Sequence, residues 1–396
     1  MSTAVLDIDV ERLPWPTDVR AGYELAVALV RVNGVPVGKV TVGVSPAGNI
    51  DARELREAVL HRLAAEIAVE RLRQSLLATA AQAPAAMSAT VVICTRERPD
   101  DLRRCLGAVT RLPDDGQEIL VVDNRPETDA TRMVAAEFPT VRYVREDRRG
   151  VNAARNRAFA EARGDVLAFV DDDAVVDAAW LRELVAPFVD PEVMCVNGLT
   201  MPLELETASQ EQFESLTGFS RRGFHGRQFQ WPPQDPLHVS ATGAGANMAL
   251  RGTALRLVGP FDLALGPGTP SESGDENEFY SRLLRAGYRI HYQPRALNWH
   301  RHRRSPEELR RVMHGYGVGV YAFWTRAFLD GEWSVLRHAW GWFWHDQAPN
   351  LVRTLIRPGR SLEHRLQREE LIGCLKGPFK YLKARGMARA QARVDG

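Results

Sequence analysis

Short hydrophobic runs alternate with amphipathic segments over residues 89–173, and this alternation dominates the sequence. The runs are rich in Val, Ile and Leu and end at turn residues, as is typical of strands that are buried on both faces of a parallel sheet. The expected strands span residues 89–94, 118–122, 141–144 and 166–170, and the expected helices span 99–109, 127–138 and 151–162. This order predicts an α/β fold, a mostly parallel sheet flanked by helices, with its ligand crevice at the carboxyl ends of the strands.

A smaller unit with a different pattern precedes this region. Residues 23–44 form two Val- and Leu-rich runs around an Asn-Gly pair, a strong short signal for a β-hairpin. A helix should begin at Asp51, because Asp51 and Glu54 have the spacing of a capping box. Its apolar face is expected to hold Leu55, Val59, Leu63, Ile67, Leu72 and Leu76. We therefore predict that residues 1–86 form a small ββα unit and that the Ala-rich stretch 79–88 is a linker. The apolar sides of the unit need a partner, either the next domain or a second subunit.

The last part of the chain differs again in composition. Residues 315–344 are rich in Gly, Tyr, Phe and Trp, and basic residues outnumber acidic residues over 351–396. Aromatic belts beside cationic helices are what an interfacial, non-spanning membrane contact requires. The alternative is that these helices cover the central domain or mediate formation of a homo-oligomer. We predict a central domain at residues 87–325 and a helical, aromatic and basic extension at 326–396.

Composition narrows the class of protein. With 396 residues, of which 45% are hydrophobic, the chain is long enough for two or three structural units. A formal charge of +1 argues against a protein that binds nucleic acid over its whole surface. The four cysteines lack the spacing of a zinc site or a disulfide framework, and no apolar run reaches the length of a membrane span. We expect no signal peptide and a cytoplasmic protein, which would lie on the inner face of the membrane if the extension binds lipid.

Three carboxylates follow directly after the last predicted strand, at Asp171, Asp172 and Asp173. Their mutual repulsion at the mouth of a low-dielectric core must be offset by a cation or by hydrogen-bond donors. The alternate members, Asp171 and Asp173, are close enough to share one hard divalent ion, which could in turn hold a diphosphate. The alternative is a solvated loop in which Asp173 caps the following helix.

Polar residues also follow other predicted strands. Thr95 and Arg96 follow the first strand, and Asp123 and Asn124 follow the second. Asp and Asn at such places are often simple turn formers, but here they would lie at the same edge as the three aspartates. The helix after the third strand offers free backbone N–H groups to an anion, and Arg155 would project from its first turn toward this edge or into solvent.

A second acidic cluster lies at Asp275 and Glu276, directly before an amphipathic helix. Acidic residues in a first helical turn are common for dipole reasons alone. A carboxylate placed there can also accept the proton of a hydroxyl that attacks an electrophilic carbon. Further on, His300 and His302 would face the same way on an extended segment, and one could reach a metal held by the aspartates; a basic surface turn is the alternative.

Two other segments could take part in binding. Residues 213–236 mix aromatic side chains with arginines in a long irregular stretch, which is typical of a lid or a binding loop but also of a packed excursion. Residues 242–250 carry small side chains that let a backbone approach a ligand closely.

Six short motifs in this order resemble those of family 2 glycosyltransferases, over roughly residues 89–325. They are Val91-Val92-Ile93-Cys94-Thr95-Arg96, Val121-Val122-Asp123-Asn124, Gly150 with Ala154-Arg155-Asn156, Val170-Asp171-Asp172-Asp173, Gly245-Ala246-Asn247 and Gly274-Asp275-Glu276. Each motif is weak alone, but the whole set in sequence is specific for the GT-A nucleotide-sugar fold. The resemblance therefore implies a GT-A, Rossmann-like sheet.

The resemblance also implies where the donor binds. The donor would be a nucleotide sugar, with UDP as the expected nucleotide. Thr95, Arg96 and Asp123 would line the nucleoside pocket, with Asp123 pairing with the base or the ribose. Further donor contacts fall on Arg155, Asp172 and Asn247.

A metal ion is implied in the same way. Asp171 and Asp173 match the DxD motif of the family, which would hold Mg²⁺ or Mn²⁺ against the diphosphate. His300 resembles the histidine that approaches the metal in related enzymes, and His302 is its substitute.

The pair Asp275-Glu276 occupies the place of the family's Glu-Asp pair, whose second member is the usual base. We therefore assign Glu276 as the catalytic base. Asp275 stays an alternative, because the order of side-chain lengths is reversed in this chain.

Together these implications predict a metal-dependent inverting glycosyltransferase that moves one sugar from a nucleotide-diphosphate donor to an acceptor hydroxyl. The acceptor would be a glycan, a lipid-linked molecule or a small molecule. No Gln-x-x-Arg-Trp motif follows the base, and the membrane helices of processive synthases are missing, so a single transfer is expected. One alternative is a sugar nucleotidyltransferase, although residues 95–99 lack the Gly-rich basic loop of those enzymes. The other is a non-catalytic nucleotide-sugar-binding module, against which the intact carboxylates argue.

Overall fold

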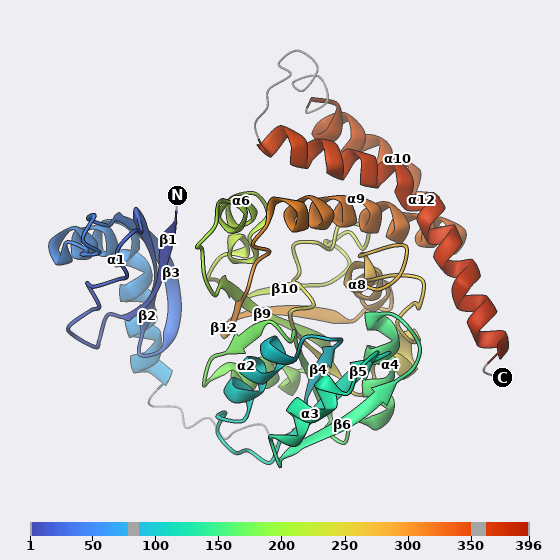
Figure 1. Cartoon of the computed structure of the whole chain (residues 1–396), viewed down its shortest axis with the longest axis horizontal. Helices are drawn as coiled ribbons and strands as arrows, with labels where there is room; N and C mark the ends of the chain where they lie inside the picture. The colour runs from blue at the N-terminus through green and yellow to red at the C-terminus, as the bar shows by residue number, and fades with distance from the viewer. Residues whose placement is uncertain (1, 78–86, 350–361, 395–396) are drawn as a thin grey trace.

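The computed structural model describes residues 2–77, 87–349 and 362–394, and its central feature is a nine-stranded sheet flanked by helices (Figure 1). The strands follow the order β10-β12-β9-β11-β7-β4-β5-β6, and β8 pairs with β12. Their bounds are β4 Ala89–Thr95, β5 Glu118–Asn124, β6 Val141–Glu146, β7 Val166–Val170, β8 Ala174–Val176, β9 Val193–Pro202, β10 Arg227–Phe229, β11 Asn247–Arg251 and β12 Arg289–His300. The four strands predicted from the sequence, β4, β5, β6 and β7, are parallel to one another, whereas β11 runs antiparallel between β7 and β9. The predicted α/β fold is confirmed.

Helices cover both faces of this sheet. Their bounds are α2 Pro99–Val109, α3 Ala130–Ala136, α4 Val151–Glu161, α5 Trp180–Val185, α6 Ala208–Thr217, α7 Ala254–Val258 and α8 Asp275–Arg285. On one face Trp180 of α5 shares a buried cluster with Ile93 of β4. On the other face Phe279 of α8 shares a second cluster with Phe169 of β7. Every residue of β7 is buried, as expected of a strand with helices on both sides.

The boundaries predicted over residues 89–173 agree with the structure to within two residues, except at α3. This helix spans Ala130–Ala136, whereas the sequence pattern predicted residues 127–138. The Glu97 carboxylate accepts hydrogen bonds from the backbone N–H groups of Glu127 and Thr128, at 2.7 and 3.0 Å. These bonds hold the two residues in a turn that precedes the helix. Further on, α8 begins at Asp275, so the acidic pair that was expected directly before this helix lies in its first turn.

The segment predicted to be irregular, residues 213–236, is more ordered than expected. Its start belongs to α6, which has a full capping box between Thr207 and Gln210. A 3₁₀ turn at Phe219–Arg222 and the short strand β10 follow. The prediction of an irregular segment is therefore wrong for its first part, which continues α6, because the capping that starts this helix lies upstream of the segment.

The N-terminal unit contains one strand more than the predicted ββα arrangement. β1 (Thr3–Asp9) pairs in parallel with β2 (Leu25–Val32), which forms the expected hairpin with β3 (Val35–Gly43), and α1 (Ala52–Leu77) packs on this sheet. β1 was missed because its partner lies far along the chain. Asp51 caps α1 by accepting the N–H groups of Arg53 and Glu54, at 2.8 and 3.3 Å.

The apolar face of α1 is shorter than predicted. Leu55, Val59, Leu63 and Ile67 are buried in the core of the unit, but Leu72 and Leu76 are 62% and 65% exposed. The end of α1 therefore contributes little to this core. The predicted linker falls largely on residues 78–86, which lie outside the described residues.

The opposite side of the N-terminal unit packs on the central sheet. Leu29 of β2 joins a buried cluster with Leu199 of β9 and Leu297 of β12. Ion pairs reinforce this contact, among them Arg31 with Asp177 at 2.8 Å and Arg295 with Glu70 at 2.6 Å. Of the two partners expected for the unit, the next domain is thus the one that the structure provides.

The C-terminal helices lie along one side of the central domain (Figure 1). They are α9 (Pro306–Leu329), α10 (Val335–Trp342) and α12 (Leu362–Val394), with a π-helical turn at Phe343–Gln347. α9 crosses the predicted boundary at residue 325, so the helical part begins earlier than predicted. In the described part of the chain, every helix is too short or too polar to cross a membrane.

Candidate active site

Three parallel strands bring polar side chains to one edge of the sheet, as predicted. Thr95 ends β4 directly opposite Asp123 of β5, and Asp171 to Asp173 follow the end of β7. Asp172 points back into the domain, where it accepts the Thr95 hydroxyl at 2.7 Å and an Arg98 N–H at 3.1 Å. Burial, together with the neighbouring Asp173 carboxylate, raises the pKa of Asp172 to about 6. Asp172 therefore ties β7 to β4.

Asp171, Asp173 and His300 form a compact group at this edge. Each offers a ligand atom within 4.8 Å of the others. His300 Nε2 lies 3.0 Å from Asp173 Oδ1 and 3.7 Å from Asp171 Oδ2. The register of β12, which pairs His300 with Ala174 of β8, brings the histidine next to the aspartates. These are the three residues that the sequence predicted as metal ligands.

Asp173 has three cationic side chains around it, from Arg98, Arg303 and His300. Arg98 and Arg303 donate to Asp173 Oδ2 at 3.2 and 3.3 Å. Although burial opposes it, His300 and these arginines hold the pKa of Asp173 below its ordinary value. Burial disfavours the His300 imidazolium, but the two aspartates outweigh burial and raise its pKa to about 10.

One buried carboxylate oxygen of this group, Asp173 Oδ1, could still accept a hydrogen bond or bind a cation. Among the described residues, Asp173 Oδ1 accepts no well-formed hydrogen bond, even though His300 lies close to it. Asp171 is nearly half exposed, with 45% of its side chain accessible. Two carboxylates and one imidazole with an unsatisfied oxygen and a solvent-facing side fit a divalent ion such as Mg²⁺ or Mn²⁺.

His302 does not join this group. It is buried, and its Nε2 lies 3.1 Å from Glu214 Oε2 of α6. His300 and His302 do face the same way, as expected, because their ring centroids lie 5.8 Å apart and both rings pack against Phe219. Only His300 reaches the aspartates. The structure thus gives His302 a different partner from the one predicted.

Asp123, which the resemblance assigned to a nucleoside pocket, lies at the end of β5. It is fully buried, and Tyr143 donates its hydroxyl to Asp123 Oδ2 at 2.9 Å. Asp123 Oδ1 has no hydrogen-bond partner among the described residues. Burial raises the pKa of Asp123. Arg96, by contrast, extends to the exposed Glu127 at 2.6 Å at the rim of this region.

The second acidic cluster begins α8. Gly274, at a φ of 87°, precedes the helix and lies against Gly319 of α9, where a Cβ would collide with the Gly319 backbone. Asp275 and Glu276 then occupy the first turn. Asp275 is 1% exposed and Glu276 is 24% exposed, so only the glutamate reaches the surface of the site.

Arg155 lies between these two carboxylates. It donates one N–H to Asp275 and another to Glu276 Oε1, the latter at 3.1 Å. The sequence placed Arg155 at the nucleotide, but it is buried and held by the acidic pair. Burial and the nearby Glu276 charge raise the pKa of Asp275 to about 7, although Arg155 opposes this shift.

Two residues of the Gly245-Ala246-Asn247 motif have distinct structural roles. A Cβ at Gly245 would overlap Glu276 Oε1 and crowd the Arg155 guanidinium, so only glycine leaves room for this pair. Asn247 is buried and donates to the Leu199 and Ala296 carbonyls at 2.8 and 2.9 Å while it accepts from Trp180. Both the N–H groups and the oxygen of its amide are hydrogen-bonded inside the fold, which does not favour the predicted contact with the donor.

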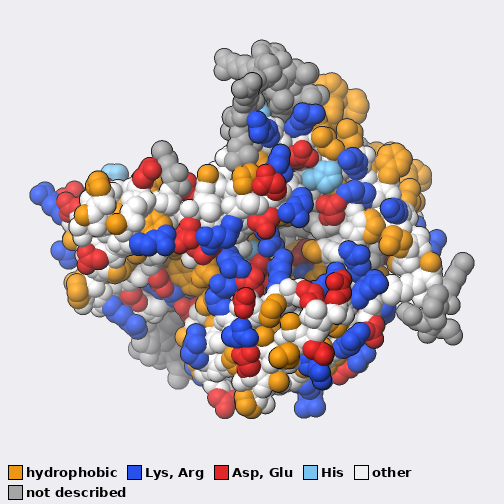
Figure 2. Space-filling view, viewed as in Figure 1, with side chains coloured by type: hydrophobic (Ala, Val, Ile, Leu, Met, Phe, Trp, Pro, Cys, Tyr) orange, Lys and Arg blue, Asp and Glu red, His pale blue; other side chains and the backbone are white. Residues whose placement is uncertain are grey.

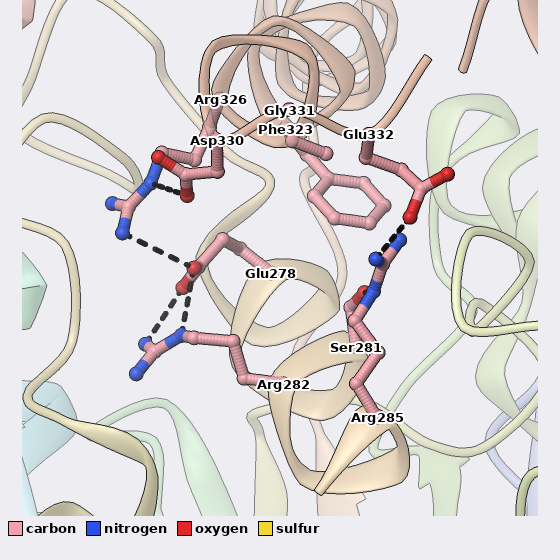
Figure 3. A pocket seen from close by; sticks show the side chains of 10 residues that line it. Glu278, Ser281, Arg282, Arg285, Phe323, Arg326, Asp330, Gly331 and Glu332 are labelled. Carbon is pink, nitrogen blue, oxygen red and sulfur yellow. Dashed lines mark hydrogen bonds and ion pairs between the residues drawn. The ribbon is translucent and has the colours of Figure 1, made fainter. Parts of the chain in front are cut away.

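An ion-pair network fixes the far end of α8 (Figure 3). It lines a cavity of about 170 Å³ between α8 and the end of α9. Glu278 accepts two N–H groups of Arg282, at 2.7 and 2.8 Å, and lies 3.9 Å from Arg326 of α9. Arg285 pairs with Glu332 in the same network. Since every charged group there has a partner, the network anchors the helix that carries Asp275 and Glu276.

Some residues near the site carry no recognisable signal in the sequence. Tyr316 of α9 is one of them: burial raises the pKa of its hydroxyl to about 12, and Glu276 and Asp171 both add to this shift. Arg222 and Arg303 act on the same hydroxyl in the opposite direction. The charges of both acidic clusters therefore act on the Tyr316 hydroxyl. It comes from a helix that no local motif connects with the strand ends.

Comparison with known proteins agrees with this geometry. Residues 90–250 match the family described as "Glycosyl transferase family 2". A pre-mycofactocin glycosyltransferase of Mycobacterium tuberculosis is 29% identical over 248 residues, which are 60% of this chain and 49% of that protein. The chain thus spans about half the length of this relative. Glycosyltransferase AglE of Haloferax volcanii is 26% identical over 245 residues, 59% of this chain and 73% of that protein.

A solved structure shows the same architecture. It is the mannosyltransferase PcManGT from Pyrobaculum calidifontis in complex with GDP-Man and Mn²⁺, and it superposes with a TM-score of 0.52 at 16% sequence identity. The superposition covers 78% of this chain and 94% of that chain. At this identity the likeness concerns the fold, and it confirms the predicted GT-A architecture.

Proposed function

Since residues 90–250 form a family 2 glycosyltransferase domain, we propose that the chain moves one sugar from a nucleotide-diphosphate donor to an acceptor hydroxyl, with inversion at the anomeric carbon. The observation that carries the proposal is the pairing of the group Asp171, Asp173 and His300 with a separate carboxylate pair at the start of α8. A sugar nucleotidyltransferase, the alternative raised by the sequence, has no support from the family match. A non-catalytic binding module would not need the second carboxylate pair.

The donor nucleoside would bind at Asp123. A buried carboxylate oxygen without a donor is costly, and a base N–H or a ribose hydroxyl would satisfy Asp123 Oδ1. Arg98 and Arg303, beside Asp173, are placed to approach the diphosphate. UDP remains our first expectation for the nucleotide, and the GDP-Man bound by the Pyrobaculum enzyme makes a GDP-sugar the second donor to test.

Asp171, Asp173 and His300 would hold Mg²⁺ or Mn²⁺, as their oxygen and nitrogen atoms fit either ion. When bound there, the ion would supply Lewis-acid stabilisation of the diphosphate that leaves. Asp172 would not contact the donor directly in this proposal, because both of its oxygens are bonded to Thr95 and Arg98. It would keep Asp171 and Asp173 in place.

Glu276 would act as the base. It is the more exposed member of the pair, so it can reach an acceptor hydroxyl, whereas Asp275 is buried against Arg155. In a single displacement the acceptor oxygen bonds to the anomeric carbon as the bond to the diphosphate breaks, and Glu276 takes the acceptor proton. Arg155 would orient the glutamate through its 3.1 Å hydrogen bond.

The acceptor could be presented at a membrane surface. On α12, Leu375, Phe379 and Leu382 are 66%, 75% and 51% exposed and share one helical face, with Lys376 and Lys383 beside them. Exposed tryptophans on and beside α10 extend this apolar surface, and hydrophobic side chains gather over these helices in Figure 2. Such a face suits peripheral binding to anionic lipid and a lipid-linked acceptor. Self-association of the chain remains a prediction.

The function is tested with a panel of UDP- and GDP-sugars. We expect one donor to raise the melting temperature only when Mn²⁺ or Mg²⁺ is present, because a ligand that binds the native state stabilises it. The same donor should then be hydrolysed or transferred, and EDTA should stop the reaction. Donor binding without any turnover, across a range of glycan, lipid-linked and small acceptors, would contradict an enzyme.

A further inference from the structure

A second group of potential metal ligands lies away from the strand-end site, where the segment after β10 meets α10. Asp235, His238 and His338 each place one ligand atom within 4.8 Å of the others. His338 Nε2 lies 3.1 Å from Asp235 Oδ2, and the two imidazole rings have centroids 4.7 Å apart at an angle of 82°. In residues 2–77, 87–349 and 362–394, the only other group of this kind is Asp171, Asp173 and His300.

The backbone that carries two of these ligands is already fixed. His238 donates its N–H to the Asp235 carbonyl at 3.0 Å, which closes a tight turn. Asp235 Oδ1 accepts the N–H of Leu237 at 2.9 Å, so the carboxylate turns its other oxygen toward His338. Leu237 is buried against α9 and α10, and Trp324 donates its indole N–H to the Leu237 carbonyl at 3.4 Å. Ligands on a rigid support lose little freedom when a metal binds.

The ligand set has the chemistry of a zinc site. Two imidazole nitrogens and one carboxylate oxygen suit Zn²⁺, whereas Mg²⁺ prefers oxygen ligands. Around a tetrahedral Zn²⁺ the ligand atoms lie roughly 3.3 Å apart, given Zn–N and Zn–O bonds of about 2.0 to 2.1 Å. The present spacing therefore needs only small side-chain rotations. Burial lowers the pKa of His338, which leaves its imidazole neutral at pH 7 and able to bind a metal.

We propose that Asp235, His238 and His338 bind a Zn²⁺ ion, with water as the fourth ligand. The exposed His238 and the partly exposed Asp235 leave an open path for the ion and the water. The ion clamps residues 235–238 to α10, two parts of the chain that are about a hundred residues apart.

The zinc ion would also stabilise a segment that leads to the candidate active site. A few residues after His238, the Ser240 and Gly243 carbonyls accept hydrogen bonds from Arg222, at 3.0 and 2.8 Å. The chain then reaches Gly245, which lies against Glu276. The ion thus steadies one end of the segment that shapes the surroundings of the proposed base. Only this consequence rests on the proposed function, and zinc binding itself does not.

The test uses the untagged full chain and Co²⁺, whose absorption spectrum reports tetrahedral nitrogen and oxygen coordination. Titrations are run in a His300→Ala background and repeated in the wild type with excess Mg²⁺, so that the strand-end site does not contribute. We expect one equivalent of Co²⁺ with tetrahedral absorption, displaced by Zn²⁺. His238→Gln and His338→Gln should each weaken binding at least tenfold, whereas His61→Gln, which changes an exposed histidine of α1, should not.

Thermal unfolding gives a second readout. Zn²⁺ should raise the melting temperature of the wild type and of His61→Gln, but not that of His338→Gln. Each protein is compared with itself without zinc. A variant that is less stable from the start therefore still shows whether zinc raises its melting temperature. The proposal is overturned if the wild type binds no Co²⁺ under these conditions, or if binding and the zinc-induced shift survive in both histidine variants. If the wild type binds zinc as expected but transfers no sugar from any donor, only the glycosyltransferase proposal is contradicted.

Discussion

Two clusters of buried carboxylates belong to the candidate site, and they are neutralised differently. At the start of α8, Arg155 contacts both Asp275 and Glu276 from within the fold. At the end of β7, Asp173 has arginine and histidine neighbours but keeps one buried oxygen without a well-formed hydrogen bond among the described residues, and Asp171 faces solvent. Both clusters have cationic neighbours, but of the two only the second has, in the described part of the chain, a buried carboxylate oxygen that lacks a well-formed hydrogen bond.

This difference separates two chemical roles. Arg155 bridges the two carboxylates of the first cluster, and the exposed member of this cluster, Glu276, can exchange a proton with a substrate. A group with an unsatisfied oxygen and an open side can take up an external cation, which lowers the repulsion between its carboxylates. The contrast therefore supports binding of the metal and the diphosphate at one cluster and proton transfer at the other. Substitutions in each cluster should therefore affect donor binding and turnover differently.

The largest effect is expected from Asp173→Ala, which removes the buried metal ligand. It should abolish metal-dependent donor binding and, with it, transfer. Isothermal titration with the donor, with and without Mn²⁺, measures the first loss. Asp177→Ala is a suitable control, because it removes another carboxylate that pairs with an arginine, Arg31, outside the site. If donor binding to Asp173→Ala still depended on Mn²⁺, Asp173 would not be the metal ligand that the donor requires.

Glu276→Gln should leave donor binding intact and lower kcat by about 10² to 10⁴, the usual contribution of a general base. The amide keeps the size of the side chain and can still accept the Arg155 N–H, but it cannot take a proton. Steady-state kinetics and donor titration together separate the two effects. A variant with nearly normal transfer, next to an inactive Asp275→Asn, would move the base to Asp275.

Residues next to a strand or a helix start could be predicted from the sequence, because local signals specify them. The run that ends at Val170 requires a buried strand, and the aspartates after it must then lie at the edge of the sheet. Contacts between distant segments were not predictable in this way. Arg155 was expected at the nucleotide, and only the fold shows that α8 brings Asp275 against it. Tyr316 carries no local signal because α9 reaches the site solely through packing.

Gly245→Ala tests whether the carboxylate pair needs the space that glycine leaves. A methyl group there would displace Glu276 and Arg155, and a shift of the base by about 1 Å lowers kcat by roughly 10- to 100-fold. Donor binding that depends on Mn²⁺ should stay close to that of the wild type. Gly107→Ala is the matched control, because a Cβ at that position in α2 would meet only Arg111, at 3.7 Å. A normal kcat for Gly245→Ala would show that the observed position of Glu276 is not the one used in transfer.

The smallest effect on transfer is expected from the titration of Asp275, which acts on the pH dependence of stability. The pKa of Asp275 is raised to about 7 in the folded protein and has its ordinary value near 3.8 in the unfolded chain. Between these values the folded state binds more protons than the unfolded state, so this group stabilises the fold at low pH and loses that contribution as the pH rises to about 7. Asp275→Asn removes the titration. Since a pKa difference of one unit corresponds to about 1.4 kcal/mol, the free energy of unfolding of the wild type relative to this variant should therefore fall by about 4 kcal/mol between pH 4 and pH 8. Urea denaturation at several pH values measures it, with the exposed Asp129→Asn as control. A difference that instead grew with pH would mean that Arg155 outweighs burial, and the two carboxylate clusters would then be alike in their preference for the ionised form.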